Sequence, residues 1–98
     1  MNPLLKRLFE IQPDETLRKA VYVADEMRDY FSICFVCQLE EKGFSFRFMK
    51  HPEKHIDIDI YPEDETVVLL LRDGSVWTHT LYVDQAVIKA KEIIESWE

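Results

Sequence analysis

The chain has 98 residues, of which 47% are hydrophobic and 32% charged, and its formal net charge is −7 at pH 7. This length permits one hydrophobic core, and the composition is typical of a globular protein and excludes a disordered one. We therefore expect a single domain over residues 1–98. The longest strongly apolar run, residues 67–71, is far shorter than the roughly 20 residues needed to cross a bilayer, so no membrane partner is expected.

The negative charge is concentrated in the second half of the chain. Residues 1–50 contain eight Lys or Arg and eight Asp or Glu, whereas residues 51–98 contain four and eleven, which leaves that half at −7. Within it, residues 51–65 hold six acidic residues against Lys54, a net charge of −5. Direct nucleic-acid binding is not expected, because it requires a basic face. A protein partner with a basic surface is the better match.

Two helices are predicted before the first strand. Asn2 can cap a helix that has Pro3 at its first position and that ends at Pro13. A second helix is predicted from about Asp14 to Asp29, because apolar residues recur there at helical spacing. Its apolar stripe consists of Leu17, Ala20, Val21, Ala24 and Met27.

Alternation with a period of two predicts five strands after these helices. Short connections, among them the turn signal Asp73-Gly74, favour antiparallel neighbours. The residues from 66 to 72 are apolar on both faces, as expected of a central strand. The five predicted strands cover residues 31–39, 44–49, 56–61, 66–72 and 75–83.

A final helix is predicted after Asp84, which can serve as its N-cap. The expected fold is therefore α+β, with an antiparallel sheet of about five strands packed under two N-terminal helices and one C-terminal helix. Meander order is the default for such short connections, although the loop at residues 51–54 leaves a rearrangement open.

The predicted sheet has apolar residues on both faces. If Phe31, Phe44 and Ile56 face the helices, the opposite face contains several apolar side chains that need a cover. That cover is either a helix or an interface with a partner or a second copy. These side chains belong to Cys34, Val36, Met49, Tyr61, Val68 and Leu70.

Two groups of residues are candidate chemical sites. Cys34 and Cys37 form a C-x-x-C pattern, but an odd offset within a strand sends them to opposite faces, so they cannot share a metal. Weak metal candidates are the imidazoles and carboxylates of His51, His55, Asp57, Asp59 and His79. The plainer interpretation is a solvated polar face, and no cofactor is expected because no cofactor motif is present.

Three functional hypotheses follow. The first is a non-catalytic protein-interaction module of the inhibitor, immunity or adaptor type, or a nucleic-acid mimic, that meets a basic partner. Its predicted contact residues are Asp57, Asp59, Tyr61, Glu63, Asp64 and Glu65. The second is a small metal-dependent or hydrolytic enzyme that uses His55, Asp57 and Asp59. The third is a homodimeric structural subunit.

The two cysteines also bear on the compartment. They are too few for a disulfide-stapled secreted domain, and the first 13 residues lack the pattern of a secretory signal. We therefore expect a reducing, cytoplasmic location.

Overall fold

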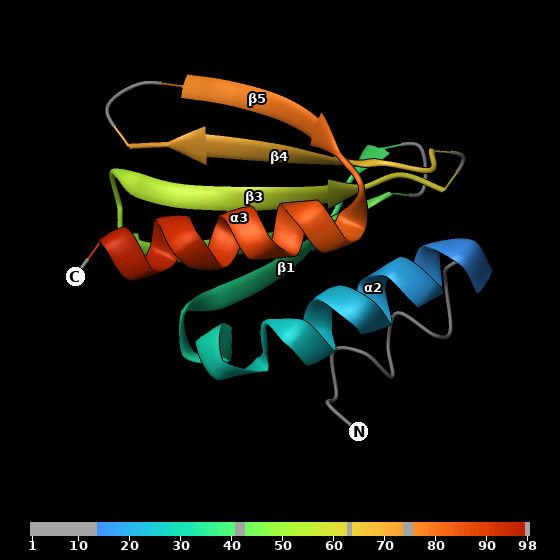
Figure 1. Ribbon diagram of the computed structural model, residues 1–98, viewed down its shortest axis with the longest axis horizontal. Helices are drawn as coiled ribbons and strands as arrows, with labels where there is room; N and C mark the ends of the chain where they lie inside the picture. The colour runs from blue at the N-terminus through green and yellow to red at the C-terminus, as the bar shows by residue number, and fades with distance from the viewer. Residues whose placement is uncertain (1–13, 41–42, 63, 74–75, 98) are drawn as a thin grey trace.

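The computed structural model describes residues 14–40, 43–62, 64–73 and 76–97. The helix predicted from Asn2 lies outside these residues. Within them the chain forms two α-helices, one 3-10 helix and five strands (Figure 1). Their bounds are α2 (Asp14–Glu26), η1 (Arg28–Ile33), β1 (Cys34–Gln38), β2 (Phe44–His51), β3 (Lys54–Ile60), β4 (Val67–Arg72), β5 (Val76–Leu81) and α3 (Val83–Ser96).

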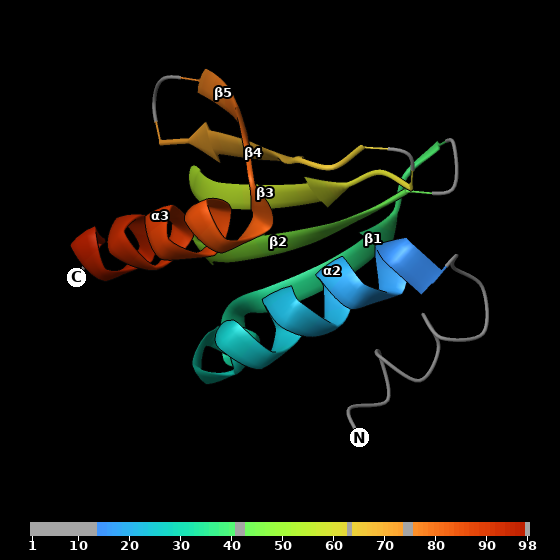
Figure 2. The ribbon, with the colours of Figure 1, turned by 45° about the vertical axis from the view of Figure 1, so that its right-hand side comes forward.

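The five strands form one antiparallel sheet in the order β1-β2-β3-β4-β5. Each strand pairs with its neighbours in sequence, so the predicted α+β fold with a meander sheet is confirmed. Both α-helices lie on the same face of this sheet, as the views in Figure 1 and Figure 2 agree. No helix in the described ranges is both long and apolar enough to span a membrane.

The hydrophobic core lies between the sheet and the helices. Alternate residues of the three central strands point into it, because successive side chains of a strand leave on opposite faces. Small residues of α2 and α3 let the helices approach the sheet closely. The buried core residues are Ala20, Val23, Ala24, Met27, Phe44, Phe46, Phe48, Ile56, Ile58, Ile60, Val67, Leu69, Leu71, Ala86, Val87, Ala90 and Ile94.

The first strand begins later than the alternation predicted. Residues 28–33 form η1, in which the Tyr30 N–H donates to the Met27 carbonyl at 2.9 Å and tightens the chain directly after α2. Phe31 and Ile33 pack against the core from this 3-10 helix. The prediction of a strand start at Phe31 was therefore wrong, because apolar residues that contact a core from a tight turn can imitate strand alternation.

The two faces of β1 are also reversed relative to the prediction. Val36 pairs with Phe46, and Cys34 pairs with Phe48, and both phenylalanines are buried under the helices. Since directly paired residues share a face, Cys34 and Val36 also face the helices. Phe35 and Cys37 lie on the other face, where Phe35 is 55% exposed. The pairing with β2, not the alternation within β1, decides which set meets the core.

Gly43 sets the close approach between the start of β2 and the end of β3. A Cβ atom at this position would lie 2.6 Å from the Ile60 carbonyl oxygen, which real Cβ atoms do not tolerate. The Gly43 carbonyl also accepts a hydrogen bond from the Leu39 N–H at 2.8 Å, which closes the β1–β2 connection. Glycine is required here because its missing side chain leaves room for the neighbouring backbone.

Candidate functional site

The sheet face opposite the helices is the candidate functional site. We call it the helix-free face, since no described helix packs on it (Figures 1 and 2). Strand pairing assigns its side chains to three rows across the sheet. The central row is Phe35, Arg47, Asp57, Leu70 and Thr78, flanked by a row of Cys37, Ser45, Asp59, Val68 and Thr80 and a row of Met49, His55, Arg72 and Val76.

A two-point ion pair occupies the centre of this face. Arg47 Nε and Nη2 donate to the two carboxylate oxygens of Asp57 at 2.8 and 2.9 Å. The Asp57 side chain is 9% exposed, whereas that of Arg47 is 44% exposed. The hydrogen bond to Asp57 raises the pKa of the Arg47 guanidinium, so its charge is permanent. The carboxylate of Asp57 is therefore neutralised within the chain.

Asp59 lies beside this pair without a comparable partner. Burial is the largest cause that raises the pKa of its carboxyl group, the charge of Asp57 raises it further, and the facing Ser45 hydroxyl and Arg47 lower it. The Ser45 hydroxyl faces Asp59 across the strand pair closely enough to lower the pKa of that carboxyl group, but the buried atoms Ser45 Oγ and Asp59 Oδ1 make no hydrogen bond of good geometry to a described residue. The Nδ1 atom of His55, in the row of Met49 and Arg72, is also buried without a hydrogen-bond partner among the described residues. The face thus retains unused hydrogen-bonding capacity.

The metal candidates do not come together as a site. His55, Asp57 and Asp59 share the helix-free face, as predicted from their spacing. His79 pairs with the buried Leu69 and therefore lies on the helix-covered face, with its ring 4.6 Å from that of Trp77. His51 ends β2 and is exposed. No three His, Cys, Asp or Glu side chains in the described part of the chain could hold a metal ion.

The predicted acidic contact residues have different environments. Asp57 is 6% exposed and held by Arg47, and Asp59 is only partly accessible. Tyr61 is half-buried directly after β3, and Glu63 lies outside the described residues. Asp64 and Glu65 are exposed in the connection between β3 and β4. Of the predicted set that the structure describes, these two carboxylates are the ones open to a basic partner.

Further carboxylates lie at the same end of the sheet as Asp64 and Glu65. In an antiparallel meander the β1–β2 and β3–β4 connections and the end of β5 share one sheet end. Exposed Glu40 lies in the first of these, and Asp84 lies in the first turn of α3 and not at the N-cap position predicted for it. We call Glu40, Asp64, Glu65 and Asp84 the acidic end. Glu40 and Asp84 lie outside the acidic segment 51–65, so counting charge along the sequence does not assign them to the acidic end. The predicted meander order could have done so, because it brings these parts of the chain to one end of the sheet.

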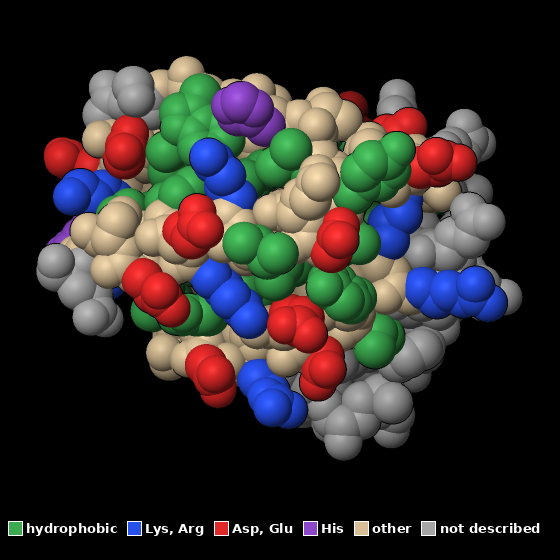
Figure 3. All heavy atoms as spheres, in the orientation of Figure 1, with side chains coloured by type: hydrophobic (Ala, Val, Ile, Leu, Met, Phe, Trp, Pro, Cys, Tyr) green, Lys and Arg blue, Asp and Glu red, His purple; other side chains and the backbone are tan. Residues whose placement is uncertain are grey.

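The helix-covered side presents a more mixed surface. Figure 3 shows acidic and basic side chains interleaved with apolar ones over this side. Some of these charges pair between α2 and α3, since Lys91 Nζ donates to Glu26 Oε2 at 3.3 Å. The Tyr30 hydroxyl likewise donates to Glu95 at 2.8 Å. This side therefore offers local pairs in place of one extended patch of a single sign.

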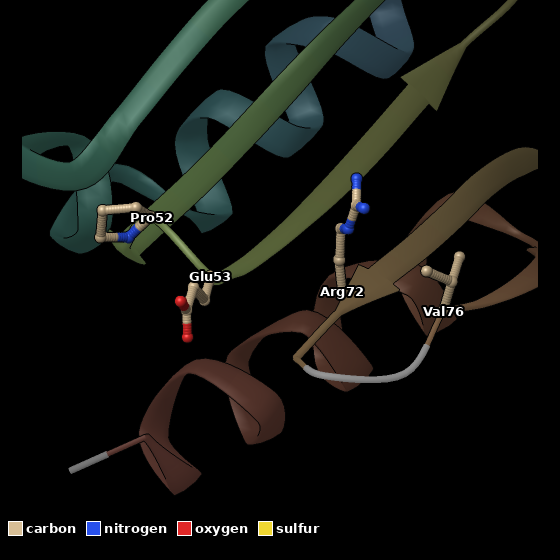
Figure 4. Close-up of a pocket in the computed structure, with 4 residues that line it drawn as sticks. All are labelled: Pro52, Glu53, Arg72 and Val76. Carbon is tan, nitrogen blue, oxygen red and sulfur yellow. The ribbon is translucent and has the colours of Figure 1, made fainter.

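A shallow cavity of about 380 Å³ lies at the opposite end of the sheet from the acidic end. Its lining residues are Pro52, Glu53, Arg72 and Val76, and all four are exposed. Figure 4 shows the Glu53 and Arg72 side chains pointing away from each other. An active site requires convergent polar groups and exclusion of water, and this cavity provides neither.

The two cysteines lie on opposite faces of the sheet, as the odd offset predicts. Cys34 is on the helix-covered face, where burial raises the pKa of its thiol to about 12. Cys37 is exposed on the helix-free face. A thiol with so high a pKa is neither a nucleophile nor a metal ligand at neutral pH.

Comparisons with known proteins add no relative. The chain matches no protein-family model, no curated protein and no solved structure. Its function must therefore be inferred from its own surfaces.

Proposed function

We propose that this protein is a non-catalytic protein-interaction module. The observation that carries the proposal is the helix-free face, which holds apolar side chains around a satisfied ion pair. Phe35 and Val76 are 55% and 62% exposed on it, and Met49, Val68 and Leu70 are partly exposed. Phe35, Met49 and Arg47 share this face, and Phe, Met and Arg are residue types enriched in protein interfaces.

The chemistry of the face supports contact more than catalysis. General acid or base work needs a carboxyl or imidazole group that is free to exchange a proton with a substrate. Asp57 is occupied by Arg47, and His79 is separated from His55 by the sheet itself. Burial raises the pKa of Asp59, but Asp59 is not among the residues that line the two cavities beside Pro52 and Glu53, and no three His, Cys, Asp or Glu side chains among the described residues could hold a metal ion.

The acidic end supports a second contact, with a basic partner. Four exposed carboxylates lie there: Glu40 in the β1–β2 connection, Asp64 and Glu65 in the β3–β4 connection, and Asp84 in the first turn of α3. By sequence the first connection has a net charge of −1, since it also holds Glu41 and Lys42, and the second has −3. A field of one sign attracts an oppositely charged surface and accelerates encounter. We place this module in a reducing, cytoplasmic compartment, which is consistent with free Cys34 and Cys37.

Affinity capture from native cells tests the proposal with three variants. The face variant, Phe35→Thr with Leu70→Thr, removes apolar side chains but keeps good strand formers. The end variant, Asp64→Lys with Glu65→Lys, reverses two exposed charges. Ile88→Gln is the matched control, because Ile88 is 59% exposed on α3 and glutamine favours a helix.

We expect a partner that is lost at high salt and from the end variant but retained by the control. Any captured protein that the face variant no longer retains, including untagged copies of the chain itself, is one that binds the helix-free face. If the face and end variants both retain every protein that the wild type captures, the proposal of an interaction module is wrong.

A further inference from the structure

We infer that the partner of the helix-free face is a second copy of this chain. This inference rests on the proposed function, because it names the occupant of the same surface. Three observations favour a second copy over another protein: the charge balance of the face, the arrangement of its charges, and its area.

The helix-free face is neutral although the chain carries −7. Its described charged residues are Arg47 and Arg72 against Asp57 and Asp59, two of each sign. Two copies of an acidic protein repel each other over most of their surfaces. On this face the repulsion is absent, so the face permits the close approach of two like-charged chains.

The charges of the face are also self-complementary. Arg47 uses Nε and Nη2 on Asp57, and no described residue occupies its third nitrogen, Nη1. Asp59 lies beside this pair on the same face and is partly accessible as a residue. A two-fold axis in the plane of a contact can exchange any two points of that plane, so Arg47 of each copy can meet Asp59 of the other. Each guanidinium would then bridge its own Asp57 and the second copy's Asp59.

The area of the face suffices for a modest dimer. Five strands about 4.8 Å apart and three side-chain rows about 6.7 Å apart give a face of roughly 24 by 20 Å. Two such faces bury about 1,000 Å², the lower bound for a specific interface. Packed face to face, the two sheets form a sandwich with helices on both outer sides.

Sedimentation equilibrium of the purified full chain from low micromolar to millimolar concentration tests the inference. We expect a reversible dimer that Ile88→Gln leaves unchanged. The face variant should raise the dissociation constant at least about tenfold, because it removes the exposed aromatic ring of Phe35 and the apolar Leu70 from the contact. Asp59→Asn should raise it about tenfold as well and should reduce its dependence on salt, because one member of each intermolecular ion pair is lost. Circular dichroism verifies that each variant is folded.

Two outcomes overturn the inference. One is a wild-type chain that remains monomeric at millimolar concentration, and the other is a dimer that the face variant does not weaken. Neither decides the proposed function, which depends on capture of a partner from cells. A monomer that still captures a protein through Phe35 and Leu70 would show that the face binds a different protein, whereas a monomer whose face and end variants lose nothing would end both proposals.

Discussion

Removing either member of the Arg47–Asp57 pair should destabilise the fold by different amounts. Arg47→Met leaves a carboxylate that is 9% exposed without its counter-ion, whereas Asp57→Leu leaves a guanidinium that is 44% exposed and can turn into water. An unpaired charge costs most where it is buried. We expect Arg47→Met to lower the free energy of unfolding by about 2–3 kcal/mol, and Asp57→Leu by about 1 kcal/mol.

The double variant completes the cycle. Arg47→Met with Asp57→Leu replaces the pair by two apolar side chains of similar volume, so its stability should return to within about 1 kcal/mol of the wild type. Urea unfolding, followed by the fluorescence of the partly buried Trp77 and Trp97 at concentrations that keep the chain monomeric, measures all four proteins. Equal losses in the two single variants, or a double variant whose loss equals their sum, would refute this account of the pair.

The remaining predictions concern Asp59, Gly43 and the cysteines. Because burial raises the pKa of Asp59 above 3.8, its protonated form stabilises the fold below that value, and this stability is lost as the pH rises through the raised pKa. Monomeric Asp59→Asn should therefore unfold at a higher temperature than the wild type at pH 7, with the difference closing towards pH 3.5, and a constant difference across this range would contradict the prediction. Gly43→Ala should cost about 2 kcal/mol in urea unfolding, because the new methyl group collides with the Ile60 carbonyl, and an unchanged midpoint would exclude that collision. In dilute native protein at pH 8, iodoacetamide should modify exposed Cys37 and leave Cys34 unmodified until unfolding, as peptide mass spectrometry can determine, and equal rates would contradict the burial of Cys34.

Alternation predicted the strands correctly where neighbouring residues differ in polarity. In β3, Ile56 and Ile58 alternate with Asp57 and Asp59, and the isoleucines are fully buried in the core. The residues of β4 are apolar on both faces, and this strand lies between β3 and β5 inside the sheet, as predicted for a central strand. In a strand such as β3, the sequence pattern alone predicts which side chains face the core, because one choice of inward face buries far more apolar surface than the other.

The same reasoning failed around β1 because both parities there are apolar. From Ile33 to Cys37 every residue is apolar, so this segment offers no polar contrast that could reveal which side of the strand faces the core. The pairing of Val36 with Phe46 and the tight turn of η1 made both decisions. The inward face of β1 depends on how the β1–β2 hairpin closes around Gly43, and the start of β1 depends on how the chain turns after α2. Both are set by residues outside the segment itself.

The candidate site shows the same division. The spacing of His55, Asp57 and Asp59 established that they share a face, but not that Arg47 lies opposite Asp57, since that depends on the hairpin register. The sequence by itself determined the fold class and the acidic character of residues 51–65, because these follow from periodicity and composition. Short connections made the meander the default strand order, and the strand pairing confirmed it. Tertiary structure alone decided that Asp57 is paired with Arg47, that His79 lies on the other face, and that the helix-free face combines apolar side chains with equal numbers of opposite charges. Those properties arise from contacts between residues far apart in the chain, and only strand pairing brings such residues together.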